Sequence, residues 1–348
     1  MGLLFSKEEN YLGIDIGTSS VKLVELQKDA GRMKLFSYGF SENKESGVKR
    51  DWKADVSRTA EIINKIWEKA GMTSRNAVAA LPAFSVFSSI LNLPSVNKKD
   101  IAAAVNWEAK KVIPLPLEEM ILDWKIIEDE AEKDSKNVKV FLTGASRMLV
   151  KKYIETFREA KINLLSLETE TFALVRSLLG NDKSTVMIVE IGATTTDISI
   201  VSKGIPMLSR SIDIGGETIT TAIGNNLNIG VERAEQFKYD LGIGNPGSET
   251  DIIPKTITET ISPIINEIKY TLNLFQSKNG AGVEKVILSG GSALLANLPA
   301  FLSKILDKQV VIGDPWSRVY CPTDLKPVLD AIGPSMSVAI GLSMRELE

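Results

Sequence analysis

Two short segments of the sequence carry an acidic residue, a glycine and several hydroxyl groups in the same order. Residues 14–20 read Ile-Asp-Ile-Gly-Thr-Ser-Ser, and residues 189–195 read Val-Glu-Ile-Gly-Ala-Thr-Thr. The acidic residues, Asp15 and Glu190, are 175 positions apart, about half of the 348-residue chain. A repeat at this spacing predicts an internal duplication, with two homologous domains that face each other.

The repeated pattern suits the binding of phosphate groups and a magnesium ion. The glycine lets the backbone approach a ligand closely, and successive N–H groups and hydroxyls can donate hydrogen bonds to phosphate oxygens. The strand-ending carboxylates of Asp15 and Glu190 suit Mg²⁺, which prefers one or two carboxylates together with waters and phosphates. A single such segment is more often an ordinary hairpin turn, so the prediction depends on the pair. The expected phosphate-binding residues are Gly17, Thr18, Ser19, Ser20, Gly192, Thr194 and Thr195.

The composition excludes several other kinds of site. The chain has no histidine and one cysteine, Cys321, which rules out Ser-His-Asp and Cys-His catalysis, histidine metal ligation and thiolate zinc clusters. Forty-one basic and 44 acidic residues give a net charge of -3, which indicates neither a nucleic-acid footprint nor an acidic tail. Neither GxxxxGK[ST] nor a GxGxxG after the first strand is present, so the sequence predicts phosphate binding by hairpins.

Alternating apolar residues predict the strands that position these segments. Residues 11–26 read as a β-hairpin around the first segment, and residues 185–200 as a second one. A third strand follows the first hairpin at 33–40, and isoleucines at helical spacing predict a helix that ends at Gly71. The start of the chain is therefore a sheet with a helix packed on it.

Residues 81–164 read as a separate small unit, called the 81–164 unit below. Its expected elements are strands at 85–93, 121–128 and 138–143, helices at about 98–112 and 149–160, and a charged loop at 130–136. Further on, isoleucines and leucines predict a long helix or a pair of helices over 252–275, with Pro263 as a kink. A strand at 286–288 and a helix over 294–306 follow.

Two segments raise the question of a membrane. The stretch 76–97 has no charged residue and is long enough to span a bilayer, but it contains two prolines and several asparagines and serines. We interpret it as buried structure of a globular domain. Residues 1–6 fit a loose myristoylation pattern, for which a plain chain terminus is the favoured interpretation. Charged residues at 7–9 follow too soon for a signal peptide.

These motifs, in this order, resemble those of the actin/Hsp70/sugar-kinase superfamily. The matching segments are 13–22 and 189–200 for the two phosphate motifs, 286–298 for the adenosine motif, and 168–178 and 337–344 for the two connecting helices. Within the superfamily the sequence is most similar to the PilM family of type IV pilus assembly proteins, which is related to the division protein FtsA. The segments 13–22, 168–176, 215–220 and 234–238 carry this closer similarity.

The resemblance implies an α/β fold: a duplicated actin-like ATPase fold, with two RNase H-like domains around a nucleotide cleft and a small inserted α+β subdomain. It implies four subdomains: 1–80 with 165–183 and 333–348 (1A), 81–164 (1C-like), 184–230 with 284–332 (2A), and 231–283 (2B).

The resemblance also assigns roles to individual residues, with ATP and Mg²⁺ as cofactors. Lys22 would reach the phosphates, Glu235 the ribose hydroxyls and Lys238 the adenine; a surface ion pair is the alternative for the last two. The residues expected to make room for the nucleotide are Gly215, Gly216, Gly290, Gly291 and Ser292. Glu170 would position the hydrolytic water, since a carboxylate is the natural general base in a chain without histidine. Glu190 stands where the superfamily usually has aspartate, so we expect slow ATP hydrolysis at most.

Three functions are compatible with this resemblance. The favoured one is a nucleotide-dependent assembly switch of the type IV pilus platform, held at the inner face of the cytoplasmic membrane by its partner and not by direct membrane insertion. An FtsA-like filament former and a metabolic kinase are the alternatives. The filament former is disfavoured because residues 343–348 leave no room for a C-terminal membrane helix. The metabolic kinase is disfavoured because such kinases are usually longer.

The expected partner is the N-terminal cytoplasmic tail of a PilN-like inner-membrane protein. We predict that it lies between the first domain and the 81–164 unit, near Phe84 and Phe87. Pilus assembly ATPases and further copies of the chain are candidate partners, and no nucleic acid is expected.

Overall fold

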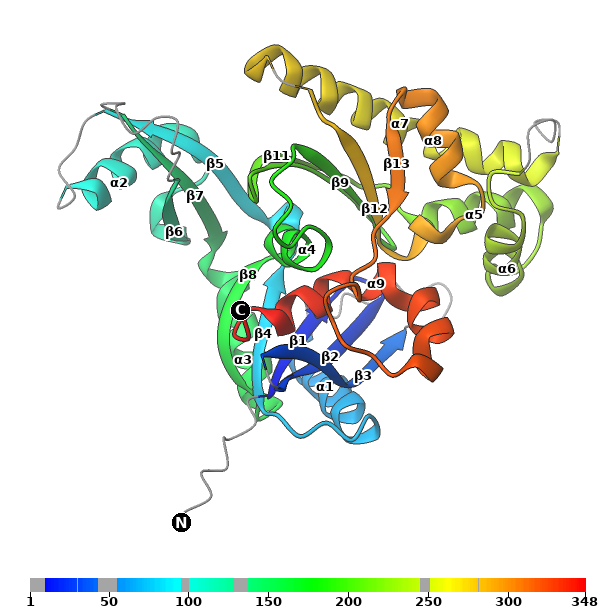
Figure 1. Ribbon diagram of the computed structural model, residues 1–348, viewed down its shortest axis with the longest axis horizontal. Helices are drawn as coiled ribbons and strands as arrows, with labels where there is room; N and C mark the ends of the chain where they lie inside the picture. Colours follow the sequence, from blue (N-terminus) through cyan, green and yellow to red (C-terminus); the bar gives the residue numbers. More distant parts are fainter. Residues whose placement is uncertain are drawn as a thin grey trace.

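The structure is a computed structural model that describes residues 10–29, 31–42, 55–94, 100–127, 137–244, 251–280 and 282–348. Three features of the sequence lie outside the described residues: the myristoylation pattern at 1–6, the charged loop at 130–136 and residues 95–97 of the uncharged stretch. The described chain forms two five-stranded sheets and one three-stranded sheet, with helices on their faces (Figure 1).

The first sheet has the strand order β3-β2-β1-β4-β8. Its strands are β1 (Asn10–Ile16), β2 (Ser20–Asp29), β3 (Arg32–Glu42), β4 (Asn76–Leu81) and β8 (Asn163–Thr169). β1 and β2 form the predicted antiparallel hairpin, and β1 runs parallel to β4. Both faces of the sheet are covered, so alternate residues of the hairpin enter two different cores.

Three helices cover the first sheet. α1 (Val56–Lys69) and α3 (Arg147–Glu159) lie on one face, and α9 (Lys326–Met344) lies on the other. α3, which we expected within the 81–164 unit, instead packs against α1, because Tyr153 and Phe157 complete the core of the first sheet. Among the described residues, one helical stretch, Thr323–Met344, is long and apolar enough to cross a membrane; 67% of its apolar window is buried inside the molecule.

The second sheet repeats the topology of the first, with the order β11-β10-β9-β12-β13. Its strands are β9 (Val186–Ile191), β10 (Thr196–Ser202), β11 (Ile205–Ile212), β12 (Lys285–Ser289) and β13 (Gln309–Ile312). The helices of this half are α5 (Gly216–Leu227), α6 (Val231–Leu241), α7 (Ile252–Asn279) and α8 (Leu298–Leu306). α7 is one helix that continues through Pro263.

The helix predicted over 294–306 begins later than expected. A 3₁₀ turn occupies Gly291–Leu294, and α8 starts only at Leu298. The reason is Asn297, whose φ of +64° places it in the left-handed region and separates the two helical segments.

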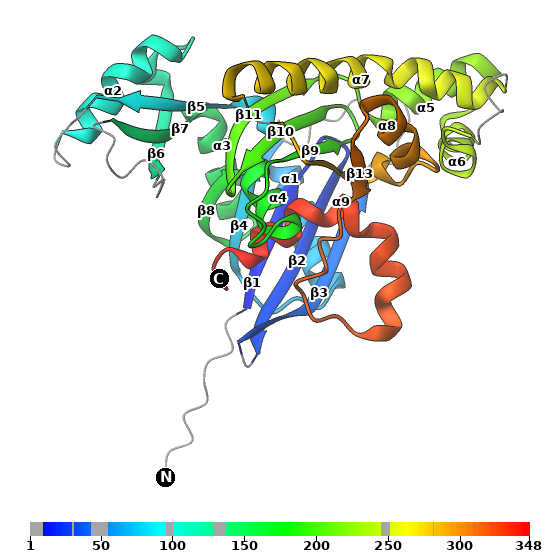
Figure 2. The same cartoon turned by 45° about the horizontal axis from the view of Figure 1, so that its top comes forward.

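The third sheet belongs to what we call the three-stranded unit. It consists of β5 (Val86–Leu93), β6 (Met120–Ile127) and β7 (Val138–Ser146) in the order β5-β7-β6, with α2 (Ile101–Val112) packed on one face. Figure 2 shows this unit projecting beside the two larger sheets. The uncharged stretch from residue 76 forms β4 and β5, and the buried residues of β4 agree with its interpretation as buried structure.

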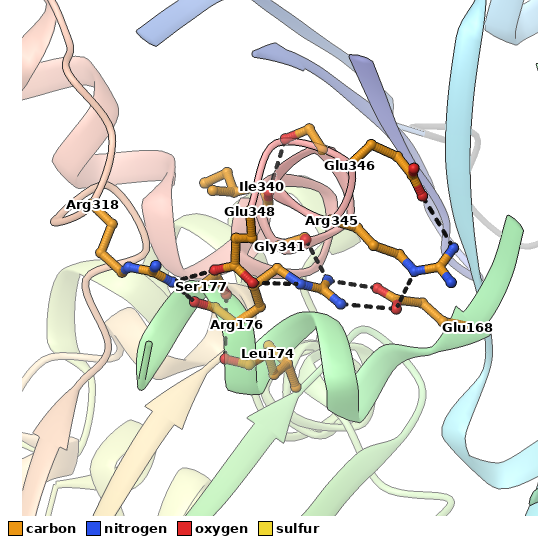
Figure 3. A network of polar contacts seen from close by, with 11 residues as sticks. Glu168, Leu174, Arg176, Ser177, Arg318, Ile340, Gly341, Arg345, Glu346 and Glu348 are labelled. Atoms are coloured by element: carbon orange, nitrogen blue, oxygen red, sulfur yellow. Dashed lines mark hydrogen bonds and ion pairs between the residues drawn. The ribbon is translucent and has the colours of Figure 1, made fainter. Parts of the chain in front are cut away.

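Two helices connect the halves of the molecule. α4 (Glu170–Leu178) crosses α9 so closely that a Cβ atom on Gly341 would lie 1.9 Å from the carbonyl oxygen of Ala173. Figure 3 shows the polar network that holds this crossing. Arg176 forms a bidentate ion pair with Glu168, at 2.7 and 3.0 Å, and donates to the carbonyl oxygen of Gly341 at 2.6 Å. Arg318 donates to the carbonyl oxygen of Arg176 and to Glu348, each at 2.8 Å.

Candidate functional site

The two repeated segments fold into equivalent turns that touch each other. In the first hairpin turn (residues 17–20), Gly17 N–H donates to the carbonyl oxygen of Ser20 at 2.9 Å; in the second (residues 192–195), Gly192 N–H donates to that of Thr195 at 2.9 Å. The hydroxyls of Thr194 and Thr18 are hydrogen-bonded at 3.0 Å. The structure thus brings together the two turns that the sequence predicts to face each other.

The strand ends behind the two turns carry different charges. In the first hairpin Asp15 pairs in register with Lys22, and their side chains form an ion pair at 3.0 Å. In the second hairpin the same positions hold Glu190 and Asp197. Burial by itself lowers the pKa of Lys22, but the charges of Asp15, Glu190 and Glu170 outweigh it, so the pKa lies above its ordinary value. Lys22 is therefore a cation among carboxylates.

Glu190 is a strongly perturbed carboxyl of the site. Burial raises its pKa well above the ordinary value, and the nearby charges of Glu170, Asp197 and Asp15 raise it further, against the opposing effect of Lys22. Asp197 was missed by our sequence reasoning. The repeat itself could have found it, because Asp197 lies 175 positions after Lys22. The expected metal residues Asp15 and Glu190 thus lie within one electrostatic cluster.

The chemistry of this cluster fits a nucleotide that brings its own magnesium ion. Within the described residues no group of three or more His, Cys, Asp or Glu is placed to form a metal cage. Mg²⁺ keeps several waters and usually binds through one or two carboxylates plus phosphates. In the part of the chain that the structure describes, four backbone N–H groups of the two turns make no backbone hydrogen bond: those of Thr18, Ser19, Ala193 and Thr194. They can therefore donate to phosphate oxygens.

The N-terminus of α5 is packed onto the second hairpin turn. Gly216 N–H donates to the carbonyl oxygen of Gly192 at 2.9 Å. A Cβ atom on Gly215 would lie 2.5 Å from the carbonyl oxygen of Ala193, and one on Gly216 would lie 2.5 Å from Oγ of Ser292. Because neither position has room for a side chain, Gly215, Gly216 and Ser292 form a tight backbone surface next to the second hairpin turn.

Glu235 and Lys238 of α6 adjoin the same surface. Lys238 Nζ contacts both carboxylate oxygens of Glu235 at 2.7 Å, the hydroxyl of Thr220 at 3.0 Å and the carbonyl oxygen of Gly216 at 3.3 Å. Lys238 is only 2% exposed, whereas the side chain of Glu235 is 43% exposed, so the ion pair joins a buried ammonium group to a carboxylate at the surface. Burial lowers the pKa of Lys238, and Glu235 opposes this shift.

The Gly290–Gly291 segment lies behind the second hairpin. Gly290 has a φ of +82°, and a Cβ atom there would be 2.3 Å from the carbonyl oxygen of Ile191. Its N–H donates to the carbonyl oxygen of Pro334 in α9 at 2.9 Å. A Cβ on Gly291 would lie 3.8 Å from the hydroxyl of Tyr239 in α6. Glycine is thus required at Gly290 by both its conformation and its close approach.

Glu170 and the two phenylalanines lie at the border of the three-stranded unit. Glu170 Oε2 accepts the backbone N–H of Ala83 at 2.7 Å. Phe84 is 54% exposed, whereas Phe87 packs against the core of the three-stranded unit. A small hollow adjoins this border, lined by Ala83, Val86, Ser88, Phe141, Thr169, Thr171, Pro206 and Ser209. The expected partner-binding pair is therefore divided: Phe84 is at the surface and Phe87 supports the fold.

The duplicated sheets, the paired hairpin turns and the glycine-lined surface beside them define an actin-like ATPase fold with a small inserted unit, as expected. The chain belongs to the family of type IV pilus assembly protein PilM, whose profile matches residues 13–347. The resemblance noted in the sequence is thereby confirmed.

Solved structures and curated proteins agree with this assignment. The chain is similar to a chain of a PilM-PilN type IV pilus biogenesis complex, with a TM-score of 0.83, 24% identity, and coverage of 97% of this chain and 98% of that one. MreB 5 of Spiroplasma citri bound to AMPPNP has the same fold, at a TM-score of 0.53, 15% identity and coverage of 96% and 94%. Cell division protein FtsA of Bacillus subtilis (strain 168) is 23% identical over 355 residues, which cover 89% of this chain and 80% of that protein.

Proposed function

We propose that the chain binds ATP with Mg²⁺ between its two hairpin turns. The observation that carries this proposal is the contact between the turns at Thr18 and Thr194, since N–H and hydroxyl donors from both halves then face one ligand. Lys22 would pair with the phosphates, and Glu235 with Lys238 would hold the nucleoside. MreB 5 of Spiroplasma citri, which has the same fold, was solved with AMPPNP bound, which supports nucleotide binding by this chain.

Mg²⁺ would be held through Asp15 and Glu190. When bound, it supplies positive charge that offsets the repulsion among the phosphates and the carboxylates. Glu170 is the proposed general base that orients the attacking water. Its electrostatic interaction with Glu190 and Lys22 supports this role, because it puts Glu170 in the same charge cluster. We expect hydrolysis to be slow, because Glu190 places its carboxylate one methylene further from the strand than an aspartate.

The same proposal makes the chain a nucleotide-dependent assembly switch of the pilus inner-membrane platform. Its partner would be the N-terminal cytoplasmic tail of a PilN-like inner-membrane protein, which would hold it at the inner face of the cytoplasmic membrane. The supporting relative is a PilM-PilN complex. The tail would dock near Phe84, which is exposed beside the hollow at the three-stranded unit. In this proposal the subdomains 1A, 1C-like, 2A and 2B are kept, except that α3 joins 1A because it packs on the core of the first sheet.

Calorimetry tests the nucleotide site. Mg-ATP should bind the wild-type chain and bind Asp15→Ala roughly 10- to 150-fold more weakly, because Asp15 would accept from the waters of the bound Mg²⁺ and a charge-assisted hydrogen bond contributes about 1.5–3 kcal/mol. Ser184→Ala, a change outside the site, is the matched control and should bind like wild type. Unaltered ATP affinity in a folded Asp15→Ala variant would contradict the proposal.

A pull-down tests the partner. A synthetic PilN-type N-terminal tail should retain the chain, with a different yield in the presence and absence of ATP. Phe84→Ala should reduce retention without changing ATP affinity, since Phe84 is exposed. Phe87→Ala is a poor probe, because it would also disturb the core of the three-stranded unit.

An FtsA-like filament former is the second candidate. It is favoured by the 23% identity to Bacillus subtilis FtsA over 89% of this chain. Sedimentation and electron microscopy with ATP distinguish the two functions. ATP-dependent polymers that form without the tail would favour filament formation, whereas a monomeric chain that binds the tail favours the assembly switch.

A further inference from the structure

Three consecutive residues at the N-terminus of α4 contact three different parts of the molecule. Glu170 accepts the backbone N–H of Ala83, just before the three-stranded unit, at 2.7 Å. The hydroxyl of Thr171 is hydrogen-bonded to that of Ser199, in β10 of the second sheet, at 3.3 Å. The ring of Phe172 lies edge-on to Phe141 of β7, with centroids 5.3 Å apart. This helix end therefore joins the second half to the three-stranded unit.

Ala83 is well placed to transmit a movement of Glu170. It is the first residue of a 3₁₀ turn, Ala83–Ser85, that is closed by a 2.9 Å hydrogen bond from Ser85 N–H to the carbonyl oxygen of Pro82. β5 begins at the very next residue, Val86. With no intervening loop, a displacement of the turn must displace the start of β5.

The carboxylate of Glu170 also belongs to the charge cluster of the hairpins. Its charge acts on both Glu190 and Lys22. A nucleotide between the hairpin turns would add several negative charges and a divalent cation to this cluster. Glu170 therefore both interacts electrostatically with the charged groups behind the turns and accepts a hydrogen bond from the segment leading into β5.

The geometry points to the hydrogen bond between Ala83 and Glu170 as the link through which nucleotide binding changes the position of the three-stranded unit. This inference rests on the proposed ATP site and deepens it, because it names the device that regulates the tail-docking surface. Ala83 is a positioning residue: it acts through its hydrogen bond to Glu170. The hollow beside it includes Ala83 and Thr171, so a shift of this helix end alters the surface next to Phe84.

Hydrogen exchange on Ala83→Pro tests the link. Proline removes the N–H donor at this position, and its fixed φ is accepted in the first turn of a helix. In the wild type, AMPPNP with Mg²⁺ should change the exchange of the β5 amides, residues 86–93, about fivefold or more. In Ala83→Pro this response should be lost while calorimetry gives the wild-type affinity for AMPPNP. Ala83→Gly keeps the N–H and should keep the response.

The possible outcomes distinguish a failure of the link through Ala83 and Glu170 from a failure of the proposed ATP site. If AMPPNP does not bind the wild type, the proposed ATP site fails, and this inference fails with it. If AMPPNP binds but β5 exchange is unchanged, or changes equally in wild type and Ala83→Pro, the site stands and the link is overturned.

A second pair of variants covers the case in which Ala83→Pro does not fold. Glu170→Gln keeps a carbonyl oxygen that can accept from Ala83 N–H, whereas Glu170→Ala keeps no acceptor. Because AMPPNP is not hydrolysed, the measurement does not depend on turnover. A response that is reduced in Glu170→Gln, which keeps the acceptor but lacks the charge, and lost in Glu170→Ala supports the link; a response retained in Glu170→Ala overturns it.

Discussion

The two halves of the molecule share one strand order and one register, but equivalent positions carry different chemistry. A shift of 175 residues superimposes the pairing of Leu12 with Glu25 on that of Met187 with Ile200. The same shift places Lys22 of the first hairpin on Asp197 of the second. The two halves thus share one backbone arrangement and differ in their side chains. The first hairpin has a cation beside its carboxylate, whereas the equivalent positions of the second hairpin are both carboxylates.

The difference extends to how each half anchors its central parallel strand. In the first half the fully buried Glu25 accepts hydrogen bonds from the backbone N–H groups of Thr73 and Ser74, at 2.8 and 3.0 Å, just before β4. In the second half that position is the core residue Ile200. There, the start of β12 is held by an ion pair at 2.8 Å between Lys285 and Asp182, both partly exposed.

The faces that meet the connecting helices differ as well. A Cβ atom on Gly13 of β1 would lie 1.9 Å from the carbonyl oxygen of Ala339, so α9 packs directly on the strand backbone. The equivalent residue of β9 is Ile188, which is buried in a side-chain core with α4. The first half is therefore joined to its helix by close backbone contact, and the second by ordinary side-chain packing.

The largest effect is expected when the two anchors are exchanged. Ile200→Glu would place a carboxylate among isoleucines of the second core with no N–H groups to receive it, so we expect loss of more than about 4 kcal/mol of folding free energy. The reciprocal Glu25→Ile leaves the N–H groups of Thr73 and Ser74 without their acceptor, at about 1–3 kcal/mol each. Denaturant unfolding measures both. Wild-type stability of Ile200→Glu would show that the two anchors are interchangeable after all.

The next effect concerns the joint between the halves. Arg176 and Glu168 are 14% and 11% exposed, and removing one partner of such a pair costs about 3 kcal/mol or more. For Arg176→Ala we expect about 3 kcal/mol, since Arg345 still lies 3.5 Å from Glu168. Lys65→Ala, which breaks an exposed helical pair with Glu61, is the control and should cost about 0.5 kcal/mol at most. Equal losses in both unfolding experiments would refute a special role for the joint.

A smaller effect is expected at the turns, where the charges of the halves differ. Lys22→Asp gives the first hairpin the same acidic character as the second. It removes the ion pair to Asp15 and adds a charge of the same sign as the phosphates, so Mg-ATP affinity should fall roughly 100-fold, or about 2.7 kcal/mol. Calorimetry measures the loss, and circular dichroism checks the fold. If ATP affinity survives, the asymmetry of the two turns has no part in nucleotide binding.

The sequence pattern predicted what is local and repeated, and missed what depends on distant segments. Alternating apolar residues around Asp15 and Glu190 located both hairpins, because strand periodicity is visible within a few residues. The same logic could not predict that Glu25 is buried, since its acceptor role depends on Thr73, 48 positions away. The packing of α3 on α1 and the burial of Lys238 are also long-range. The roles of the site residues stay predictions until nucleotide binding is measured.

The smallest effect separates the exposed anchor of the second half from the buried anchor of the first. Hydrogen bonds from Lys285 and then Ser184 lower the pKa of Asp182 from 3.8 to about 2. Because the folded-state pKa is depressed, the stabilisation is complete well above pH 4 and is lost as the pH falls from about 4 towards 2. Both partners are about one-third exposed, so solvent screening limits the contribution to less than about 1 kcal/mol. Asp182→Asn should therefore lower the free energy of unfolding slightly at pH 7, converge with the wild type in acid, and lose its effect in 1 M salt.

Glu25→Gln, measured in the same salt series, should keep its full effect because the carboxylate is buried. Equal salt dependence of the two variants would show that the anchors differ in position only, and not in kind.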